Sequence, residues 1–209
     1  MNFKNGKKFY ISLLVLFLVG MLWSGYQPPA GHFTWGLEVF PAVIALFILM
    51  FTIKKFEFSK LVYILILLHA FILMHGGHTT YANEGIFNWI RDEFGLDRNY
   101  YDRLGHFAQG FTPAVIAFEY FTVRNIVLNK KWLIFIIIFF VLGFSAFYEF
   151  IEWWVSLLSG EAGNDFLGTQ GDIWDTQWDM FMCFLGSLTA LSIFRNSKFL
   201  NTNEEIKKH

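Results

Sequence analysis

The stretch WLIFIIIFFVLGFSAFYEFIEWWVSLL, Trp132–Leu158, decides the class of this protein. It exceeds the roughly 20 apolar residues with which a helix crosses the hydrocarbon core of a bilayer. Its only charged residues are Glu149 and Glu152. The whole chain shares this character, because 55% of its residues are hydrophobic and 21% are aromatic. We therefore expect an all-α membrane protein rather than a soluble one.

Apolar stretches of this kind recur along the chain and predict a polytopic bundle of six transmembrane helices. No internal repeat or second domain is evident, so residues 1–209 are expected to form a single membrane domain. The expected spans are Phe9–Ser24, Trp35–Ile53, Leu61–Tyr81, Leu104–Val123, Trp132–Leu158 and Trp174–Phe194.

The basic residues predict the orientation of the bundle. Of the 16 Lys and Arg residues, only Arg91, Arg98 and Arg103 fall in the segments assigned to the outer side. The others precede the first span, follow the last, or lie in the connections between spans two and three and between spans four and five. Because cytoplasmic loops carry the excess of Lys and Arg, both termini are expected to be cytoplasmic, with residues 195–209 as a cytoplasmic tail.

The outer segment 84–102 has a pattern of its own. Ile86, Ile90 and Phe94 repeat at four-residue spacing, opposite a charged face. This pattern predicts a short amphipathic helix that lies on the outer membrane interface. A polar loop with one helical turn is the alternative.

Ionisable side chains recur inside the predicted spans, where a charge that faces lipid is costly. With a rise of about 1.5 Å per helical residue, groups from five spans fall in the outer half of a bilayer core about 30 Å thick. Their shared depth predicts a polar pocket inside the bundle. The groups are Glu38, His75, His78, His106, Gln109, Glu149, Glu152, Asp175 and Asp179.

Spacing places several of these groups on common helix faces. Asp102 and His106 stand at i and i+4, and Glu149 and Glu152 stand at i and i+3. Side chains at these spacings share one face of a helix. We expect His106 to act as a general acid and base oriented by Asp102, with Glu149, Glu152 and Asp179 as further catalytic groups.

Neighbouring polar residues are expected to bind the substrate. Gln170 lies in the glycine-rich loop GEAGNDFLGTQG, residues 160–171, which contains no Lys or Arg. The glycines permit close backbone approach, so the loop is expected to close over the pocket; a tight reversal between two spans is the alternative. The expected substrate-binding residues are Glu38, Arg103, Gln109, Gln170, Asp172 and Asp175.

Several carboxylates in one half of a bilayer repel one another and require a compensating charge. Protons, Arg103, protonated histidines or a bound divalent cation each supply it. Mixed His and carboxylate ligands suit Zn²⁺, Mn²⁺ or Fe²⁺, although the chain has no HExxH or paired ExxH motif. The expected ligands of such a metal are His75, His78, His106, Glu149, Glu152 and Asp179.

Structural roles compete with these assignments for the carboxylates. Asp172 and Asp175 suit the N-cap and N3 positions of the last span, and Asp102 suits a cap of the fourth. Glu149 and Glu152 could lie at the wet interface instead of in a pocket. These alternatives stay open at the level of sequence.

The histidines and one further carboxylate have similar alternatives. His75 and His78 could be hydrogen-bonded packing residues, and His69, nearer the middle of the membrane, is expected to be one. Glu119 lies near the inner end of the fourth span and is expected to reach water there.

Three runs of residues carry a resemblance to a known family: YDRLGHFAQGFTPA (Tyr101–Ala114), FYEFIEW (Phe147–Trp153) and GTQGDIWDTQWDM (Gly168–Met180). Together they resemble the YjdF-type family of bacterial inner-membrane proteins, and the likeness covers nearly the whole chain. The resemblance implies a multi-pass protein of the bacterial inner membrane and the positions of site residues, but no activity.

A looser similarity is to VanZ-like membrane proteins, which are associated with glycopeptide-antibiotic resistance. That family carries an Asp-Lys-x-x-His element, a Glu in a following span and a late helix that contains Asp. Here Arg103 replaces the lysine and Glu152 stands where Gln is usual. The similarity implies only a role in the cell envelope. The residues at comparable positions are Asp102, His106, Glu149, Asp175 and Asp179.

Three functions fit these residues. The first is a membrane-embedded enzyme, or enzyme-like lipid-binding protein, that acts from the outer leaflet on a lipid or cell-envelope substrate. The second is a transporter or permease for a proton, a cation or an envelope lipid, and the third is a non-catalytic partner subunit. Membrane lipid is the expected partner and nucleic acid is not; the sequence leaves the oligomeric state open.

Overall fold

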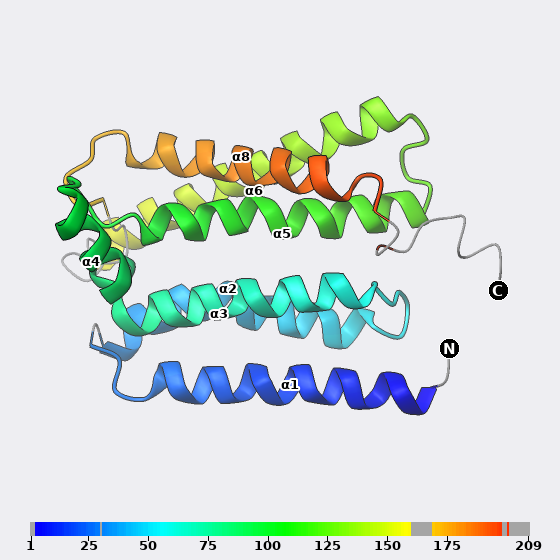
Figure 1. Ribbon diagram of the computed structural model, residues 1–209, viewed down its shortest axis with the longest axis horizontal. Helices are drawn as coiled ribbons and strands as arrows, with labels where there is room; N and C mark the ends of the chain where they lie inside the picture. Colours follow the sequence, from blue (N-terminus) through cyan, green and yellow to red (C-terminus); the bar gives the residue numbers. More distant parts are fainter. Residues whose placement is uncertain (1–2, 30, 160–168, 198–199, 201–209) are drawn as a thin grey trace.

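The computed structural model describes residues 3–29, 31–159, 169–197 and 200. Over these residues the protein is all-α, as predicted, with long helices that run along one axis of the molecule (Figure 1). The short helices η1 and α4 lie between α3 and α5. The elements are α1 (Phe3–Gly25), α2 (Gly31–Thr52), α3 (Lys60–Thr79), η1 (Tyr81–Asn83), α4 (Gly85–Phe94), α5 (Tyr101–Val123), α6 (Lys130–Ser159) and α8 (Asp175–Phe194).

By length and composition, five helices of the described part are apolar enough to cross a membrane. They are Gly6–Gly25, Gly31–Thr52, Lys60–Thr79, Lys130–Leu158 and Asp175–Phe194. The exception among the long helices is α5, which carries Asp102, Arg103 and Glu119 and buries all three. A sixth span through α5 therefore remains a prediction, and so does the orientation of the termini.

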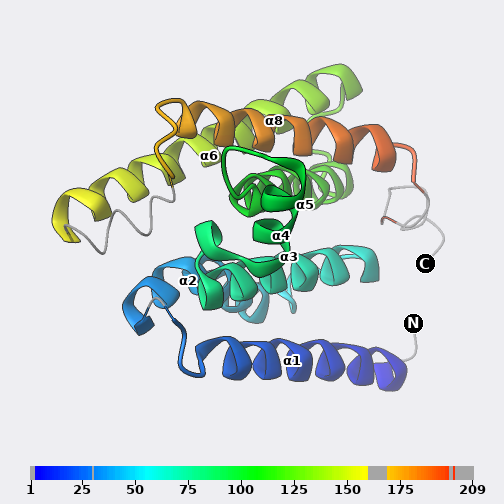
Figure 2. The same cartoon turned by 60° about the vertical axis from the view of Figure 1, so that its left-hand side comes forward.

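The long helices form two groups that meet along α3 and α5. The first group packs α1 and α2 on α3, and the second packs α6 and α8 on α5. Each group has a core of its own, one around Phe17, Leu67 and Met74 and the other around Val115 and Ile137. In Figure 2, α5 lies between α3 on one side and α8 on the other.

The closest helix contact of the protein joins α5 to α8. A Cβ atom on Gly110 would lie 1.8 Å from the carbonyl oxygen of Cys183, and one on Gly186 would lie 2.1 Å from that of Phe107. Only glycine allows the two backbones to approach so closely, a device that is common between membrane helices. This contact sets the register of α5 against α8, and both helices carry predicted site residues.

The two ends of the bundle differ in character. The first turn of α1 and the last turn of α8 lie at one end, whereas α4 and the connections into α5 and α8 lie at the other (Figure 1). Glu84 begins α4 by accepting a hydrogen bond from the backbone N–H of Phe87, and Gly95 ends it with φ of 62°. The predicted amphipathic helix is thus present, with Ile86, Trp89 and Phe94 exposed.

The expectation that Glu119 reaches water is wrong. Its side chain is 0% exposed, and its two carboxylate oxygens accept hydrogen bonds from the backbone N–H and the hydroxyl of Ser59, both at 2.6 Å. Ser59 is the N-cap of α3, where backbone N–H groups lack helical partners. Glu119 therefore ties the end of α5 to the start of α3.

Candidate functional site

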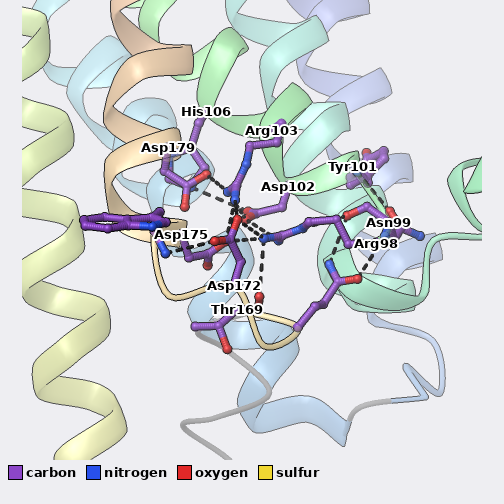
Figure 3. A network of polar contacts seen from close by, with 12 residues as sticks. Arg98, Asn99, Tyr101, Asp102, Arg103, His106, Thr169, Asp172, Asp175 and Asp179 are labelled. Atoms are coloured by element: carbon purple, nitrogen blue, oxygen red, sulfur yellow. Dashed lines mark hydrogen bonds and ion pairs between the residues drawn. The ribbon is translucent and has the colours of Figure 1, made fainter. Parts of the chain in front are cut away.

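Two arginines hold the N-terminal ends of α5 and α8 together. The guanidinium of Arg98 donates to Oδ1 of Asp175 at 2.5 Å and to Oδ2 of Asp172 at 3.4 Å. That of Arg103 donates to the same two oxygens, at 2.6 and 3.3 Å. Figure 3 shows both guanidinium groups converging on these aspartates. We call Arg98, Arg103, Asp172 and Asp175 the arginine clamp.

The carboxylates of the clamp are not the helix caps that their spacing suggested. The N-cap of α8 is Trp174, and Asp175 is the first helical residue rather than the third. Asp172 precedes the cap and accepts the backbone N–H of Trp174 at 2.9 Å. The N-cap of α5 is likewise Tyr100 rather than Asp102. Contacts with arginine, more than capping, therefore account for the burial of Asp175, which is 5% exposed.

A buried asparagine orders the loops around the clamp. Asn99 is fully buried, and its side-chain amide donates to the carbonyl oxygen of Glu84 and to Asn88, each at 2.9 Å. Gln170, a predicted substrate-binding residue, pairs with the backbone of Asn99 through two hydrogen bonds of 2.9 Å. The structure thus places Gln170 between two loops, where it supports the entry into α8. The other loop residues of the closing segment, 160–168, lie outside the described residues.

His106 lies just below the clamp and is held by two helices. Its Nδ1 lies 2.9 Å from Oε1 of Gln109, an oxygen that also accepts the hydroxyl of Ser145 at 3.4 Å. Since that oxygen can only accept, Nδ1 donates to it, and in a neutral ring Nε2 is the unprotonated nitrogen. Nε2 then presents its lone pair to Oδ1 of Asp102 at 3.5 Å and to Oδ1 of Asp179 at 3.6 Å.

A lone pair that faces two carboxylates requires a proton or a cation between them. One oxygen each of Asp102 and Asp179 and one ring nitrogen of His106 lie within 4.8 Å of one another, and all three residues are buried. Ligands about 2.1 Å from a tetrahedral Zn²⁺ stand roughly 3.4 Å apart, which matches the two distances to Nε2. Arg103 competes for the same carboxylates, because its Nη1 donates to Asp179 and, at 3.3 Å, to Asp102. We call Asp102, His106 and Asp179 the histidine centre.

A cavity of about 70 Å³ opens on the side of His106 away from the clamp. A water molecule needs only about 10–15 Å³ measured in this way, so the cavity has room for a few waters or a small polar group. Among the described residues that line it, none is Lys or Arg. The polar residues of the lining are Glu38, His69, Tyr81, Asp102, His106, Gln109, Tyr148 and Glu152.

Two buried polar atoms near this cavity have no hydrogen-bond partner. One is Oε1 of Glu149, which lies 3.9 Å from Nδ1 of His106, and the other is Nε2 of His69. His69, expected to be a packing residue, lines the cavity. Unpaired buried polar atoms are costly, and they mark the cavity side of His106 as the place where a ligand would find free hydrogen-bonding groups.

His75 and His78, both predicted metal ligands, lie in other surroundings. His75 Nε2 contacts Oε1 of Glu84 at 2.9 Å, and His78 Nδ1 contacts the backbone oxygen of Ser24 at 2.9 Å. Both rings lie against Trp23, with centroid distances of 5.8 and 5.0 Å. They join α3 to α1 and to the start of α4, because their face of α3 is turned toward α1.

Glu84 has a charge environment of its own outside the spans. Burial raises the pKa of this carboxyl, but hydrogen bonds from His75 and from the backbone N–H groups of Phe87 and Ile86 lower it by more. The pKa of Glu84 is therefore held below its ordinary value, and the carboxylate is kept charged at the N-terminus of α4.

The structure adds residues that the sequence did not single out. Arg98 and Asn99 lie outside the predicted spans, and neither Tyr81 nor Tyr148 was among the predicted site residues. One signal for Arg98 was available, because Arg98 and Asp102 stand at i and i+4, and their charged atoms are 3.8 Å apart. No such spacing pointed to the two tyrosines, because the sequence does not show which face of a helix is turned toward the site.

These features define a polytopic membrane protein with a buried His and carboxylate centre at one end of the bundle. The chain belongs to the family described as "Predicted membrane protein (DUF2238)", whose model matches residues 9–198. It is similar to "Inner membrane protein YjdF" of Escherichia coli (strain K12), with 46% identity over 158 residues, or 76% of each chain. No solved structure matches the chain.

The family match confirms the resemblance to YjdF-type proteins. Together with the apolar helices, it makes this chain a multi-pass protein of the inner membrane. The similarity to VanZ-like proteins stays a prediction.

Proposed function

We propose that this protein is a six-span membrane enzyme whose histidine centre acts from the outer side on a lipid or cell-envelope substrate. The observation that carries the proposal is the fixed direction of Nε2 of His106 toward Asp102 and Asp179. Such an arrangement supports proton transfer by the ring or capture of a divalent cation. Both are ways to activate a hydroxyl or a water in a buried site.

The proposed topology has both termini in the cytoplasm and α5 as the sixth span. The 23 residues of α5 extend over about 35 Å, which is enough to cross a bilayer core. The charges of α5 are paired inside the protein, Arg103 with aspartates and Glu119 with Ser59, so they do not face lipid. The connection between α2 and α3, which contains Lys54 and Lys55, and the start of α6 lie at the opposite end from α4 (Figure 1), in agreement with a cytoplasmic side there.

The proposed chemistry follows from the charges around His106. A neutral ring takes a proton from a substrate hydroxyl or a water through Nε2, and Asp102 and Asp179 stabilise the imidazolium that forms. Glu149, with an unpaired oxygen 3.9 Å from Nδ1, is placed to receive the Nδ1 proton of that imidazolium, which leaves a neutral ring protonated at Nε2. If Zn²⁺, Mn²⁺ or Fe²⁺ binds, Asp102, His106 and Asp179 would hold it, and the ion would lower the pKa of a bound water.

Metal binding by the purified protein tests the chemistry. After chelator treatment, the protein in detergent is titrated with Zn²⁺ and Mn²⁺ by calorimetry. We expect one site per chain that is lost in His106→Gln and in Asp179→Asn. His75→Gln is the matched control, because His75 contacts Glu84 instead of the centre. If all variants bind metal like the wild type, the metal part of the proposal is wrong and proton transfer by His106 remains.

Lipid analysis of cells tests whether the centre is an enzyme site. Cells that lack the protein are complemented with the wild type, His106→Gln, Asp102→Asn or His75→Gln, at matched expression. We expect the wild type and His75→Gln to restore the lipid profile and the other two variants to fail. A wild-type profile from both centre variants would refute an enzyme at this site.

Proton or cation transport is a second candidate, and the cavity that reaches His69 favours it. A transporter needs a polar route onward to the inner side. The next groove in that direction is mostly apolar, with Ala45, Ile48 and Leu49 in its wall. Proton uptake by vesicles that contain the protein discriminates the two, since only transport predicts a flux that His69→Leu abolishes.

A further inference from the structure

The second helix leaves a groove open along the side of the bundle. α2 packs mainly on α3, while α6 packs on α5 and α8. A groove of about 420 Å³ lies between α2 and α6 and has walls from α3 and α5 as well. Its lining is nearly all apolar, with Ala45 and Ile48 from α2, Ile116 from α5 and Phe140 from α6. We call this space the lateral groove.

The lateral groove meets the cavity beside His106. Pro113 of α5 lines both spaces, and the same four helices supply both linings. Along α2, the combined path runs from Glu38 to Thr52, a distance of about 21 Å at 1.5 Å per residue. A polar compartment thus adjoins an apolar one at Pro113, and together they offer room for a headgroup and an acyl chain.

The charge of the cavity selects the kind of headgroup. Glu38, Asp102 and Glu152 line the cavity, and none of the described lining residues is Lys or Arg. Asp102 is contacted from outside the cavity by Arg103, whereas Glu38 and Glu152 have no ion pair among the described residues. An anionic group in the cavity would be repelled by Glu38 and Glu152, whereas a primary ammonium would neutralise them and donate up to three hydrogen bonds. At about 70 Å³ the cavity suits such a small group rather than a sugar.

We infer that the cavity and the lateral groove together bind one aminolipid, with its primary ammonium group beside Glu38 and Glu152 and one acyl chain between α2 and α6. The inference rests on the proposed function in taking the cavity beside His106 as the working site, and it names the substrate class. The lipid enters sideways from the bilayer, between α2 and α6.

Native mass spectrometry of the purified protein in detergent tests the inference. The probes are dioleoyl phosphatidylethanolamine, which has a primary ammonium, and its phosphatidylcholine and phosphatidylglycerol counterparts. We expect the phosphatidylethanolamine to be retained about tenfold better than the phosphatidylglycerol, which corresponds to about 1.4 kcal/mol. Glu38→Gln is expected to reduce this preference, because it removes one of the charges that the ammonium meets.

Blocking the groove tests the place of the acyl chain. Ala45→Trp puts an indole into the lateral groove and is expected to lower retention of phosphatidylethanolamine about tenfold. Ile44→Trp is the matched control, because Ile44 is the preceding residue on α2, is 41% exposed and does not line the groove. Ile116→Trp, in the opposite wall, repeats the test should Ala45→Trp fail to fold.

Equal retention of the three lipids by the wild type would overturn the inference, and so would equal retention by Ala45→Trp and Ile44→Trp. These results are separable from a failure of the proposed function. If the protein shows no lipid selectivity but its histidine centre still binds metal and it still restores the lipid profile, only the assignment of an aminolipid is contradicted. Selective retention by an inactive His106→Gln variant supports the lipid site independently.

Discussion

Carboxylates lie on both sides of His106, and the two sides differ in whether arginine contacts them. On the clamp side, Asp172 and Asp175 each accept from both Arg98 and Arg103. On the cavity side, Glu38 and Glu152 line a space to which the described residues contribute no Lys or Arg, and Glu149, beside His106, has a buried oxygen without a hydrogen-bond partner in the same part of the chain. A buried carboxylate with a cation in contact holds helices together, whereas one without such a partner is available for a ligand or a proton.

This difference separates structure from chemistry within one acidic cluster. The clamp joins the loops before α5 and α8 and fixes their first turns, and Asp102 and Asp179 of those helices then face His106 (Figure 3). Substitutions on the two sides should therefore have opposite effects on stability and on function.

Removal of an arginine from the clamp is expected to have the largest effect. Arg103→Ala leaves the carboxylates of Asp102, Asp175 and Asp179 short of a cation in a buried site, and breaking a buried ion pair costs about 3–5 kcal/mol. The free energy of unfolding in detergent micelles measures this loss. Arg91→Ala, which breaks the more exposed pair with Asp92, should change little. Similar losses in the two variants would contradict the structural role of the clamp.

A methyl group between α5 and α8 is expected to have the next largest effect. Gly110→Ala would bring Cβ to 1.8 Å from the carbonyl oxygen of Cys183, so the helices must separate. Overpacking of this kind costs about 1–3 kcal/mol and should also weaken metal binding, because Asp102 and Asp179 come from the two helices. Gly143→Ala on α6, where a Cβ meets nothing within 4 Å, is the control. Unchanged stability of Gly110→Ala would show that the close contact does not set the register.

On the cavity side, removal of a charge is expected to leave the stability of the protein unchanged or to raise it. Glu149→Gln removes a buried charge whose Oε1 has no hydrogen-bond partner, so stability should be unchanged or rise by about 1 kcal/mol. Asp175→Asn, its counterpart on the clamp side, should destabilise, because it weakens contacts with both arginines. Thermal unfolding of the two variants under the same conditions measures this difference in stability. Comparable destabilisation by both would remove the distinction between the two sides.

The smallest expected effect is an acid-dependent one at Glu84. Because the folded pKa of this carboxyl lies below its ordinary value, its contribution to stability is present above the ordinary pKa and is lost as pH falls through the folded one. Between about pH 6 and about pH 3, the wild type should therefore lose more stability than Glu84→Gln. Thermal melting across this range measures the difference. Parallel pH profiles for the two proteins would contradict a charged Glu84 in the fold.

Local patterns in the sequence predicted the helices well. The span predicted at Trp132–Leu158 is helix α6, Lys130–Ser159, and the one predicted at Trp174–Phe194 is α8, Asp175–Phe194. Hydropathy over about 20 residues is a property of a continuous segment, so it needs no knowledge of neighbours. The i, i+4 relation of Asp102 and His106 was available for the same reason, since it depends only on helix geometry.

The partners across helices could not be read from spacing. Depth placed His75 and His106 in one half of the bilayer, yet His75 contacts Glu84 while His106 faces Asp102 and Asp179. Depth is one coordinate, and contact also requires the rotation of each helix about its axis and the choice of neighbour. The prediction for Glu119 was wrong for a similar reason, because Ser59, which donates a hydrogen bond to it, is the N-cap of another helix.

The sequence by itself determined the class of protein, its helices and the set of polar residues near one face of the membrane. Only the tertiary structure decided which carboxylates are neutralised by arginine and which face an open cavity. The physical reason is that hydropathy and helical spacing act along the chain, whereas charge compensation acts through space. On the clamp side it depends on the close approach of α5 and α8 at Gly110 and Gly186, which brings Asp175 to Arg103.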